Sequence, residues 1–525
     1  MSEDSIFGRF RSFFWPIHRH EMRKFLPMLA ILFLVVFNYS ILRNMKDALV
    51  VTTSGAEVIP FIKVWAMLPG AIFLTLLFTR LSSKYSQERV FYIMVSMFLS
   101  CFLLFTFVLY PLRDYIHPNF LAVILGDILP QGFQGLIATV CNWSYTLFYV
   151  MCELWGSMIM SVIFWGFANE VTHLHEARRF YSVFMIFSNI AAIAAGQTAN
   201  YLTFGEGTVL GLPILTQDAW HETMMLLILV VTVGGILMMF TFRWVNKNVL
   251  TDPCFDQLHL TKKNLKKKGK MSMKESFSYL SNSKYLLCIA FMVLSYNLTI
   301  NLAEVVWKDR LRELYPEPSD LNKYLNNLTS AVGILSTLTA IFMSRIIAKY
   351  GWTKTALITP VMMLITCMGF FSFVIFEDYL GPVVLTITGL TPIVIAAFFG
   401  AAQNCFSKAM KYSVFDATKE MTFIPLEHEV KLRGKAAIDG VGSRCGKSGG
   451  SLIHQGLILF IGSLTASAPI VAVIIIGVIV GWIYSLRSLG AQFAEMTMSE
   501  DKSLAQGEVA EEVVDVLSEP KPANA

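Results

Sequence analysis

Charged residues are scarce in this chain of 525 residues. Only 15% of its residues are charged, whereas 55% are hydrophobic, and the mean hydropathy is +0.57. Soluble domains carry about 25% charged residues. A composition so poor in charge excludes a soluble protein with a single hydrophobic core, and it favours a membrane protein with many spanning segments.

Cysteine pairs and a cleavable leader are also missing. The eight cysteines are scattered, no two form a CxxC pair, and most lie in apolar runs. This pattern excludes a disulfide framework and gives no sign of a zinc site or another cofactor. The first 25 residues are polar and basic and lack the short apolar core of a signal peptide. We therefore expect residues 1–25 to be a cytoplasmic segment and the apolar run from Leu26 to stay in the membrane.

Long apolar runs take up most of the remaining sequence. A spanning helix needs about 20 mostly apolar residues, and twelve segments meet this requirement. They lie near residues 26–46, 58–80, 90–110, 136–168, 180–203, 222–243, 285–306, 325–347, 354–376, 383–411, 435–463 and 467–486. The fourth and the tenth are too long for straight spans, so we expect them to extend beyond the membrane or to break.

A basic linker divides these spans into two halves of six. Residues 246–284 contain nine lysines, and basic connections stay on the cytoplasmic side of a membrane. This places both termini in the cytoplasm, with one half at 26–245 and the other at 285–490. The acidic tail, residues 491–525, has few apolar residues and is expected to be disordered.

The two halves resemble each other weakly. RLSSKY (80–85) ends the second span and RIIAKY (345–350) ends the eighth, while FNYSILRNMKD in span one resembles LSYNLTINLAE in span seven. Aligning Tyr39 with Tyr296 sets Asp47 opposite Glu304. We predict an all-α membrane protein of twelve transmembrane helices, in two six-helix halves of major-facilitator type.

Several ionisable residues lie inside the predicted spans, where a charge is costly. Glu153 and Glu304 cannot reach water along their own helices, so we expect them to pair internally or to line a cavity. Lys46 and Asp47 end the first span, where Asp47 could also serve as a salt-bridge partner. Lysines nearer to span ends can extend to the interface instead, and we interpret Lys63, Lys308, Lys408 and Lys411 in this way.

The stretch GVGSRCGKSGGSLIHQG, residues 440–456, contains a Gly-Lys-Ser motif. A phosphate-binding loop needs GxxxxGK[ST] directly after a buried strand. Val441 stands where the first glycine should be, and KLRGKAAIDG before it does not read as a strand. We interpret the glycines as sites of close helix packing, with Lys447 and Arg444 on one helix face.

Buried cations need negative partners. Glu153, Glu304 and Asp439 can compensate some of them, and an anionic substrate can compensate the rest. Nearby aromatic rings can stack a planar base. The predicted substrate site therefore comprises Lys46, Glu153, Glu304, Lys447, Arg444, Asp47, Tyr39, Tyr149 and Asp439.

Four segments together resemble the ATP/ADP translocase family of plastids and obligate intracellular bacteria. They are LRNMKDALVVT, the Glu153 segment, NLAEVVWKDRLRELYP and RGKAAIDGVGSRCGKSGGSLIHQG, and the resemblance runs from about His18 to Leu489. It implies a twelve-span carrier, not an enzyme, that exchanges external ATP for internal ADP without hydrolysis. It also implies functional roles for Lys46, Glu153, Glu304 and Lys447.

The resemblance further implies a bacterial cytoplasmic membrane, with ATP and ADP as substrates and the lipid bilayer as surroundings. We expect no nucleic-acid partner and no obligatory protein partner. Arg80 and Arg345, at matching cytoplasmic span ends, are predicted to latch the two halves. The alternatives are a carrier of other nucleoside triphosphates, with or without protons, and an organic-anion carrier of the same fold. A channel and a membrane NTPase are further alternatives, separable by counter-substrate dependence and ATP hydrolysis.

Overall fold

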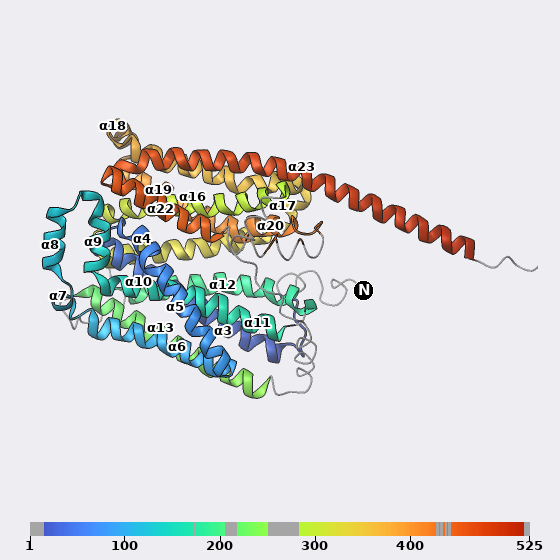
Figure 1. Cartoon of the computed structure of the whole chain (residues 1–525), viewed down its shortest axis with the longest axis horizontal. Coiled ribbons are helices and arrows are strands. Elements are labelled where there is room, and N and C mark those ends of the chain that lie inside the picture. The colour runs from blue at the N-terminus through green and yellow to red at the C-terminus, as the bar shows by residue number, and fades with distance from the viewer. Residues whose placement is uncertain are drawn as a thin grey trace, which may run out of the picture.

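The chain folds as two helical halves placed side by side. In this computed structural model, Figure 1 shows the N-terminal half below the C-terminal half, with their helices running roughly along the same axis. The structure describes residues 15–172, 174–204, 218–249, 283–426 and 443–518, and also residues 430, 434, 435 and 438. No strand occurs in these described residues.

The N-terminal half is built from long helices interrupted by short ones. Its elements are α3 (Met22–Ser54), α4 (Val58–Phe61), η1 (Ile62–Ala66), α5 (Met67–Lys84), α6 (Gln87–Leu104), η2 (Phe105–Leu109), α7 (Arg113–Ile116), α8 (Asn119–Ile128), η3 (Gln131–Phe133), α9 (Gln134–Cys141), α10 (Trp143–Trp155), η4 (Gly156–Phe164), α11 (Trp165–Val171), α12 (Leu174–Leu202) and α13 (Ala219–Asn248).

The C-terminal half has fewer but longer elements. They are α16 (Lys284–Leu314), α17 (Pro318–Ile375), α18 (Glu377–Thr388), α19 (Pro392–Met410), η5 (Lys411–Phe415), α20 (Asp416–Met421), α22 (Ser443–Ile461) and α23 (Leu464–Ser518). The 58-residue α17 contains two of the predicted spans, because Gly351 adopts φ 75° and breaks the helical path between them.

Eleven helices within the described ranges are long and apolar enough to cross a membrane. They match eleven of the twelve predicted spans. The twelfth, near 435–463, corresponds to α22, which has 19 residues but opens with the polar, glycine-rich SRCGKSGG. This helix packs beside α16 and α23 inside the C-terminal half.

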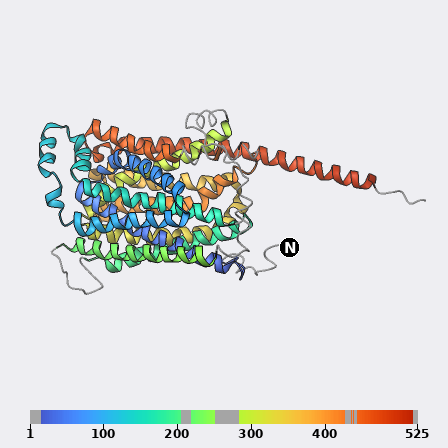
Figure 2. The same cartoon turned by 60° about the horizontal axis from the view of Figure 1, so that its bottom comes forward.

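Both overlong spans break. The fourth is interrupted at Asn142, between α9 and α10, and the tenth at Gly389, which has a left-handed φ of 70° after α18. The disorder predicted for the acidic tail stays a prediction, while the backbone of α23 continues as helix to Ser518, far beyond the bundle (Figures 1 and 2). This stretch is rich in helix-forming residues, and it extends a helix that already exists.

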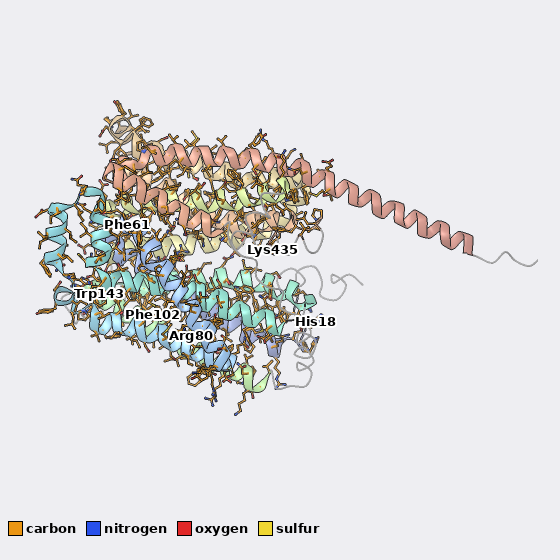
Figure 3. The ribbon with its side chains drawn as sticks, in the orientation of Figure 1. His18, Phe61, Arg80, Phe102, Trp143 and Lys435 are labelled. Carbon is orange, nitrogen blue, oxygen red and sulfur yellow. The ribbon has the colours of Figure 1, made fainter. Side chains whose placement is uncertain are left out.

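Hydrogen bonds between the halves gather toward the end of the bundle that carries α9. The Asn44 amide of α3 donates to Asn326 Oδ1 of α17 at 2.8 Å, and Gln455 Nε2 of α22 donates to the Pro60 carbonyl at 2.8 Å. In the same region α12 meets α17 through Gln197–Ser330 and Asn200–Asn327, and Thr203, directly after α12, accepts from Asn322. In Figure 3, the labelled Phe61 and Trp143 lie toward this end and His18 toward the opposite one. The halves are therefore joined at the α9 end.

Candidate functional site

Two adjoining chambers lie between the halves. One, of about 250 Å³, is lined largely by charged and polar side chains and is called the cationic chamber below. The other, of about 340 Å³, has mainly apolar and amide-bearing walls and is called the amide chamber. Six residues line both: Tyr39, Arg43, Asp47, Glu304, Lys308 and Lys408. The chambers are thus two parts of one site, within the size range of small-molecule pockets.

Lys46 is the buried centre of the N-terminal side of this site. Its Nζ lies 2.9 Å from Asp47 Oδ1 and 3.2 Å from Glu153 Oε2, and it stands 3.8 Å from the centre of the Tyr149 ring. Lys46 and Asp47 are 2% and 4% exposed. A lysine this deep needs such partners, because desolvation of an ammonium is not offset by packing alone.

Lys308 connects the two halves within the site. Its Nζ lies 2.9 Å from Asp47 Oδ2 of α3 and 3.4 Å from Glu304 Oε1, one helical turn before it on α16. Asp47 therefore accepts from Lys46 with one oxygen and from Lys308 with the other. This carboxylate holds one cation from each half, so a relative movement of the halves must disturb it.

Further cations enter the cationic chamber from both halves. Lys63 donates to Asn301 Oδ1 across the halves at 2.8 Å, and Lys411 stands 5.9 Å from the Tyr296 ring centre. Arg43, Lys408 and Lys447 line the chamber and form no ion pair with any described residue. Among the described residues, the walls carry seven basic side chains against three carboxylates; the bases are Arg43, Lys46, Lys63, Lys308, Lys408, Lys411 and Lys447, and the acids are Asp47, Glu153 and Glu304. The formal excess is four positive charges.

π-Helical turns place several of these residues. Lys63 lies within η1, Lys411 begins η5, and Ser157 of the chamber wall lies in η4, the segment that follows Glu153. A π-turn inserts one extra residue into a helix and rotates the side chains that follow, and such turns are frequent at functional sites. The helices here depart from regular geometry next to the charges.

The Gly-Lys-Ser stretch lies in a helix rather than in a phosphate-binding loop. Lys447 occupies the second turn of α22 and is exposed toward the cationic chamber. A Cβ on Gly446 would lie 2.7 Å from Asn297 Cβ, and one on Gly450 would lie 3.1 Å from Asn301 Cβ. These two glycines allow α22 to approach α16 closely, as predicted from the small-residue pattern.

The remaining predicted site residues lie in different places, and some lie outside the described part of the structure. Tyr39 lines both chambers and packs against Gly156, whereas Tyr149 is 1% exposed beneath Lys46. Asp439 and the side chains of Arg444 and Arg345 lie outside the described part of the structure. Arg80 is exposed near the end of α5, labelled in Figure 3, and forms no ion pair with any described residue. Its predicted latch role stays a prediction.

The interpretation of four lysines as interfacial was wrong. Lys63, Lys308, Lys408 and Lys411 all line the cationic chamber. Distance from a span end does not reveal which way a side chain faces, and in this bundle the four face inward. A helical-spacing signal was present for two missed residues: Lys308 follows Glu304 by four positions, and Arg43 precedes Asp47 by four.

Comparison with known sequences decides the family. A model of the TLC ATP/ADP transporter family matches residues 1–493. This chain belongs to the TLC ATP/ADP transporter family. Among its relatives, ADP,ATP carrier protein 1 of Chlamydia pneumoniae is 44% identical, covering 97% of this chain and 99% of the relative. ADP,ATP carrier protein 1, chloroplastic, of Arabidopsis thaliana is 39% identical, covering 96% and 79%. The predicted resemblance to plastid and bacterial carriers is confirmed.

Solved structures support the predicted fold. A bacterial homologue of the iron transporter ferroportin, in an inward-facing state, superposes with a TM-score of 0.50 at 13% identity. The match covers 89% of the present chain and 100% of the homologue. The inward-open xylose transporter XylE from E. coli has a TM-score of 0.50 at 11% identity, over 89% and 99%. At such identities the likeness concerns the fold alone, and it confirms a multi-pass membrane protein of major-facilitator type.

Proposed function

We propose that this protein exchanges external ATP for internal ADP across a bacterial cytoplasmic membrane, without hydrolysing ATP. Relatives with 39–44% identity are named ADP,ATP carrier proteins. The observation that carries the proposal is the excess of four positive charges in the cationic chamber. The polyphosphate chain of ATP carries about four negative charges near neutral pH and that of ADP about three, so either nucleotide compensates most of the excess.

The phosphates are proposed to lie between Lys46 of α3 and Lys447 of α22, which face the chamber from opposite halves. Lys308, Arg43 and Lys408 add positive charge along the wall, while Glu153 and Glu304 keep part of the cluster neutral in the empty carrier. Closing the halves around unpaired cations is unfavourable, because desolvated like charges repel. Only a loaded carrier would then reorient, which is a physical cause for obligatory exchange.

Exposed cations at one end of the bundle indicate which end faces the cytoplasm. The exposed cations Lys84, Arg89, Lys349 and Lys354 lie at span ends away from α9, and cytoplasmic ends of spans are enriched in Lys and Arg. We therefore place that end in the cytoplasm together with both termini. Since the halves are joined at the α9 end, the structure corresponds to an inward-facing form, and rocking of the halves would expose the same site outward.

The direct test is uptake of labelled ATP into proteoliposomes with and without trapped ADP. We expect uptake to require internal ADP. Lys46→Ala and Lys447→Ala should reduce it by about 100-fold, the scale expected when a charged partner of the phosphates is truncated, whereas Lys84→Ala, at an exposed span end, should transport normally. Equal transport by all three variants would show that the cationic chamber is not the nucleotide site.

The same assay separates the alternatives. Uptake that persists without internal ADP indicates a channel, or a proton-coupled carrier if it follows an imposed pH gradient. Competition by other nucleoside triphosphates as strong as that by ATP indicates a broader substrate range. Release of inorganic phosphate from ATP by the purified protein would contradict transport without hydrolysis.

A further inference from the structure

A third cavity lies apart from the two chambers, on the flank of the N-terminal half. It is an apolar groove of about 370 Å³ with walls from η1, α5, α6 and α10, and it is called the flank groove below. It shares no described lining residue with either chamber. Phe73 and Leu147 on its walls are exposed, whereas Leu74 and Val150 are buried. The groove is therefore closed at its back and open on the side that faces the bilayer.

The described side chains of the flank groove leave no hydrogen-bond donor for a ligand. Trp143 and Thr146 are the two lining residues with a polar side chain. Trp143 Nε1 donates to the Ile116 carbonyl at 3.1 Å, and Thr146 Oγ1 donates to the Thr139 carbonyl at 2.8 Å. The other lining residues are glycine or have apolar side chains, so a ligand gains affinity from apolar burial. This chemistry suits a hydrocarbon chain and disfavours a polar solute.

The length of the flank groove matches the depth of one leaflet. The groove follows α10 from Trp143, the first residue of the helix, to Leu154, the last but one. At about 1.5 Å per residue, this stretch is about 17 Å long, and one leaflet supplies about 15 Å of hydrocarbon, half of the bilayer core. Tryptophan is enriched at membrane interfaces, and Trp143 lies toward the α9 end (Figure 3). The groove thus has the length and placement of one acyl chain that starts at the interface on the α9 side.

The helix α5, on one side of the groove, has little support from the rest of the protein. In the span Val58–Lys84, which contains α5, only 17% of the most apolar stretch is buried, the lowest value among the eleven spans found in the described ranges. A Cβ on Gly70 would lie 3.1 Å from Val150 Cγ1, so α5 contacts α10 closely at this glycine. Along the open groove, by contrast, a lipid chain can supply the packing that protein side chains do not.

We propose that the flank groove binds one acyl chain of a phospholipid from the leaflet on the α9 side, and that this chain supports two turns of the cationic chamber. Ala66 of the groove wall follows Lys63 by three positions in η1, and Leu154 directly follows Glu153. The exposed apolar flanks of the spans face the same acyl chains, so the groove continues the surface that the protein presents to the bilayer. Lipid binding itself needs no nucleotide; only the support of Lys63 and Glu153 rests on the proposed function.

Photolabelling of the full-length protein in liposomes tests the site. The probe is a phosphatidylethanolamine with a photoreactive group midway along one acyl chain, added at increasing mole fraction, and mass spectrometry maps the labelled peptides. Labelling of α10 should saturate, whereas labelling of the exposed flank of α13 should rise in proportion to the probe. Leu147→Trp fills the mouth of the groove and should reduce the saturable labelling by about tenfold or more. The matched control is Leu229→Trp, at an exposed position on α13 outside the groove, and it should leave that labelling unchanged.

Two results would overturn the acyl-chain site. One is labelling of α10 that rises in proportion to the probe, as on α13, which would show the surrounding bilayer lipid only. The other is saturable labelling that Leu147→Trp leaves unchanged. Thermal melting shows whether Leu147→Trp folds, and Met97→Trp, which enters the groove from the α6 wall, takes its place if it does not. Saturation in the wild-type protein is measured without any variant, so the first result decides in every case.

Calorimetry of ATP binding tests the support that the chain gives to Lys63 and Glu153. Delipidated protein in detergent is compared with the same protein after phosphatidylethanolamine is added back. The added lipid should tighten ATP binding by about fivefold or more in the wild type and in Leu229→Trp, and it should have no such effect in Leu147→Trp. Equal ATP affinity with and without lipid in the wild type would overturn the support role. Failure of the proposed function has a different signature: saturable labelling of α10 in a protein that binds no ATP under either condition.

Discussion

Two clusters of charged side chains lie along α3, and they differ in the balance between positive and negative charge. At the end opposite α9, Lys24 Nζ lies 2.7 Å from Glu176 Oε2, and Arg179 makes two bonds to the Glu21 carboxylate, at 3.0 and 2.5 Å. All four residues are less than 9% exposed. Further along the same helix, the cationic chamber gathers seven bases against three acids. One cluster is balanced, and the other has an excess of one sign.

The difference distinguishes a structural role from a ligand-binding one. In the balanced cluster the two cations pair with the two carboxylates, and these ion pairs hold the start of α3 against α12. An unbalanced cluster is unfavourable when empty, and it persists only if a partner outside the chain compensates it during function. Burial alone would not separate these cases, because Lys24 and Lys46 are equally hidden.

The largest expected effect concerns the balanced cluster. Lys24→Met removes the cation beside the buried Glu176 carboxylate, and it should lower the free energy of unfolding by about 3–5 kcal/mol. The double variant Lys24→Met/Glu176→Gln should recover most of this loss, since neither charge is then buried without its partner. Chemical denaturation in detergent measures both. A double variant as unstable as the single one would show that charge balance is not what this cluster provides.

A smaller effect of opposite sign is expected in the unbalanced cluster. Lys408→Met removes a cation that forms no ion pair with any described residue, so the unliganded protein should gain about 1–2 kcal/mol in free energy of unfolding. Its ATP affinity should fall about tenfold, because a phosphate loses a charged partner. Lys84→Met, at an exposed span end, is the matched control for both measurements. Destabilisation of the empty protein by Lys408→Met would remove the distinction between the clusters.

The smallest expected effect lies at the α9 end. Glu57 Oε1 and Arg312 Nη1 join the halves at 3.9 Å, but both side chains are partly exposed, and such pairs contribute about 0–1 kcal/mol. Glu57→Gln should therefore raise the external thiol-labelling rate of a Ser448→Cys reporter in the cationic chamber by less than about fivefold. A tenfold or greater rise would make this pair a principal gate.

Acidification should change the labelling rate in the same direction as Glu57→Gln. Burial raises the pKa of the Glu57 carboxyl above its ordinary value, with Arg312 opposing the shift. As the pH falls through that pKa, the carboxylate is neutralised and its attraction to Arg312 is lost, so labelling should increase slightly in the protein that carries Ser448→Cys alone. Glu57→Gln has no carboxylate at this position and should lack that component.

The sequence was sufficient for those parts of the molecule that depend on composition and local pattern. Apolar length predicted the spans, and the excess length of the fourth and tenth predicted the breaks at Asn142 and Gly389. Glu153 and Glu304, which were expected to pair internally or to line a cavity, both line the cationic chamber, where Glu153 contacts Lys46 and Glu304 contacts Lys308. An acid inside a span has few alternatives to a cavity or an ion pair, so such residues are informative without a structure.

What the sequence did not reveal depends on rotation about helix axes and on contacts between distant segments. The orientation of Lys63 and Lys411 follows from π-turns, which have no reliable sequence signature. Asn404 of α19 lines the amide chamber, and its amide has no hydrogen-bond partner among the described residues. This becomes visible only when every neighbouring donor and acceptor is placed. Low apolar content also suggested disorder after residue 490, although helix propensity in that stretch favours the continuation of α23 to Ser518.

The most direct test of the account compares the binding of adenosine, ADP and ATP to the purified wild-type protein by calorimetry. If a polyphosphate compensates the excess of four positive charges in the chamber, adenosine should bind at least about 100-fold more weakly than ADP or ATP, and added salt should weaken the two nucleotides far more than adenosine. Adenosine that binds as tightly as ADP, with no dependence on salt, would contradict the central claim that phosphate charge neutralises this site.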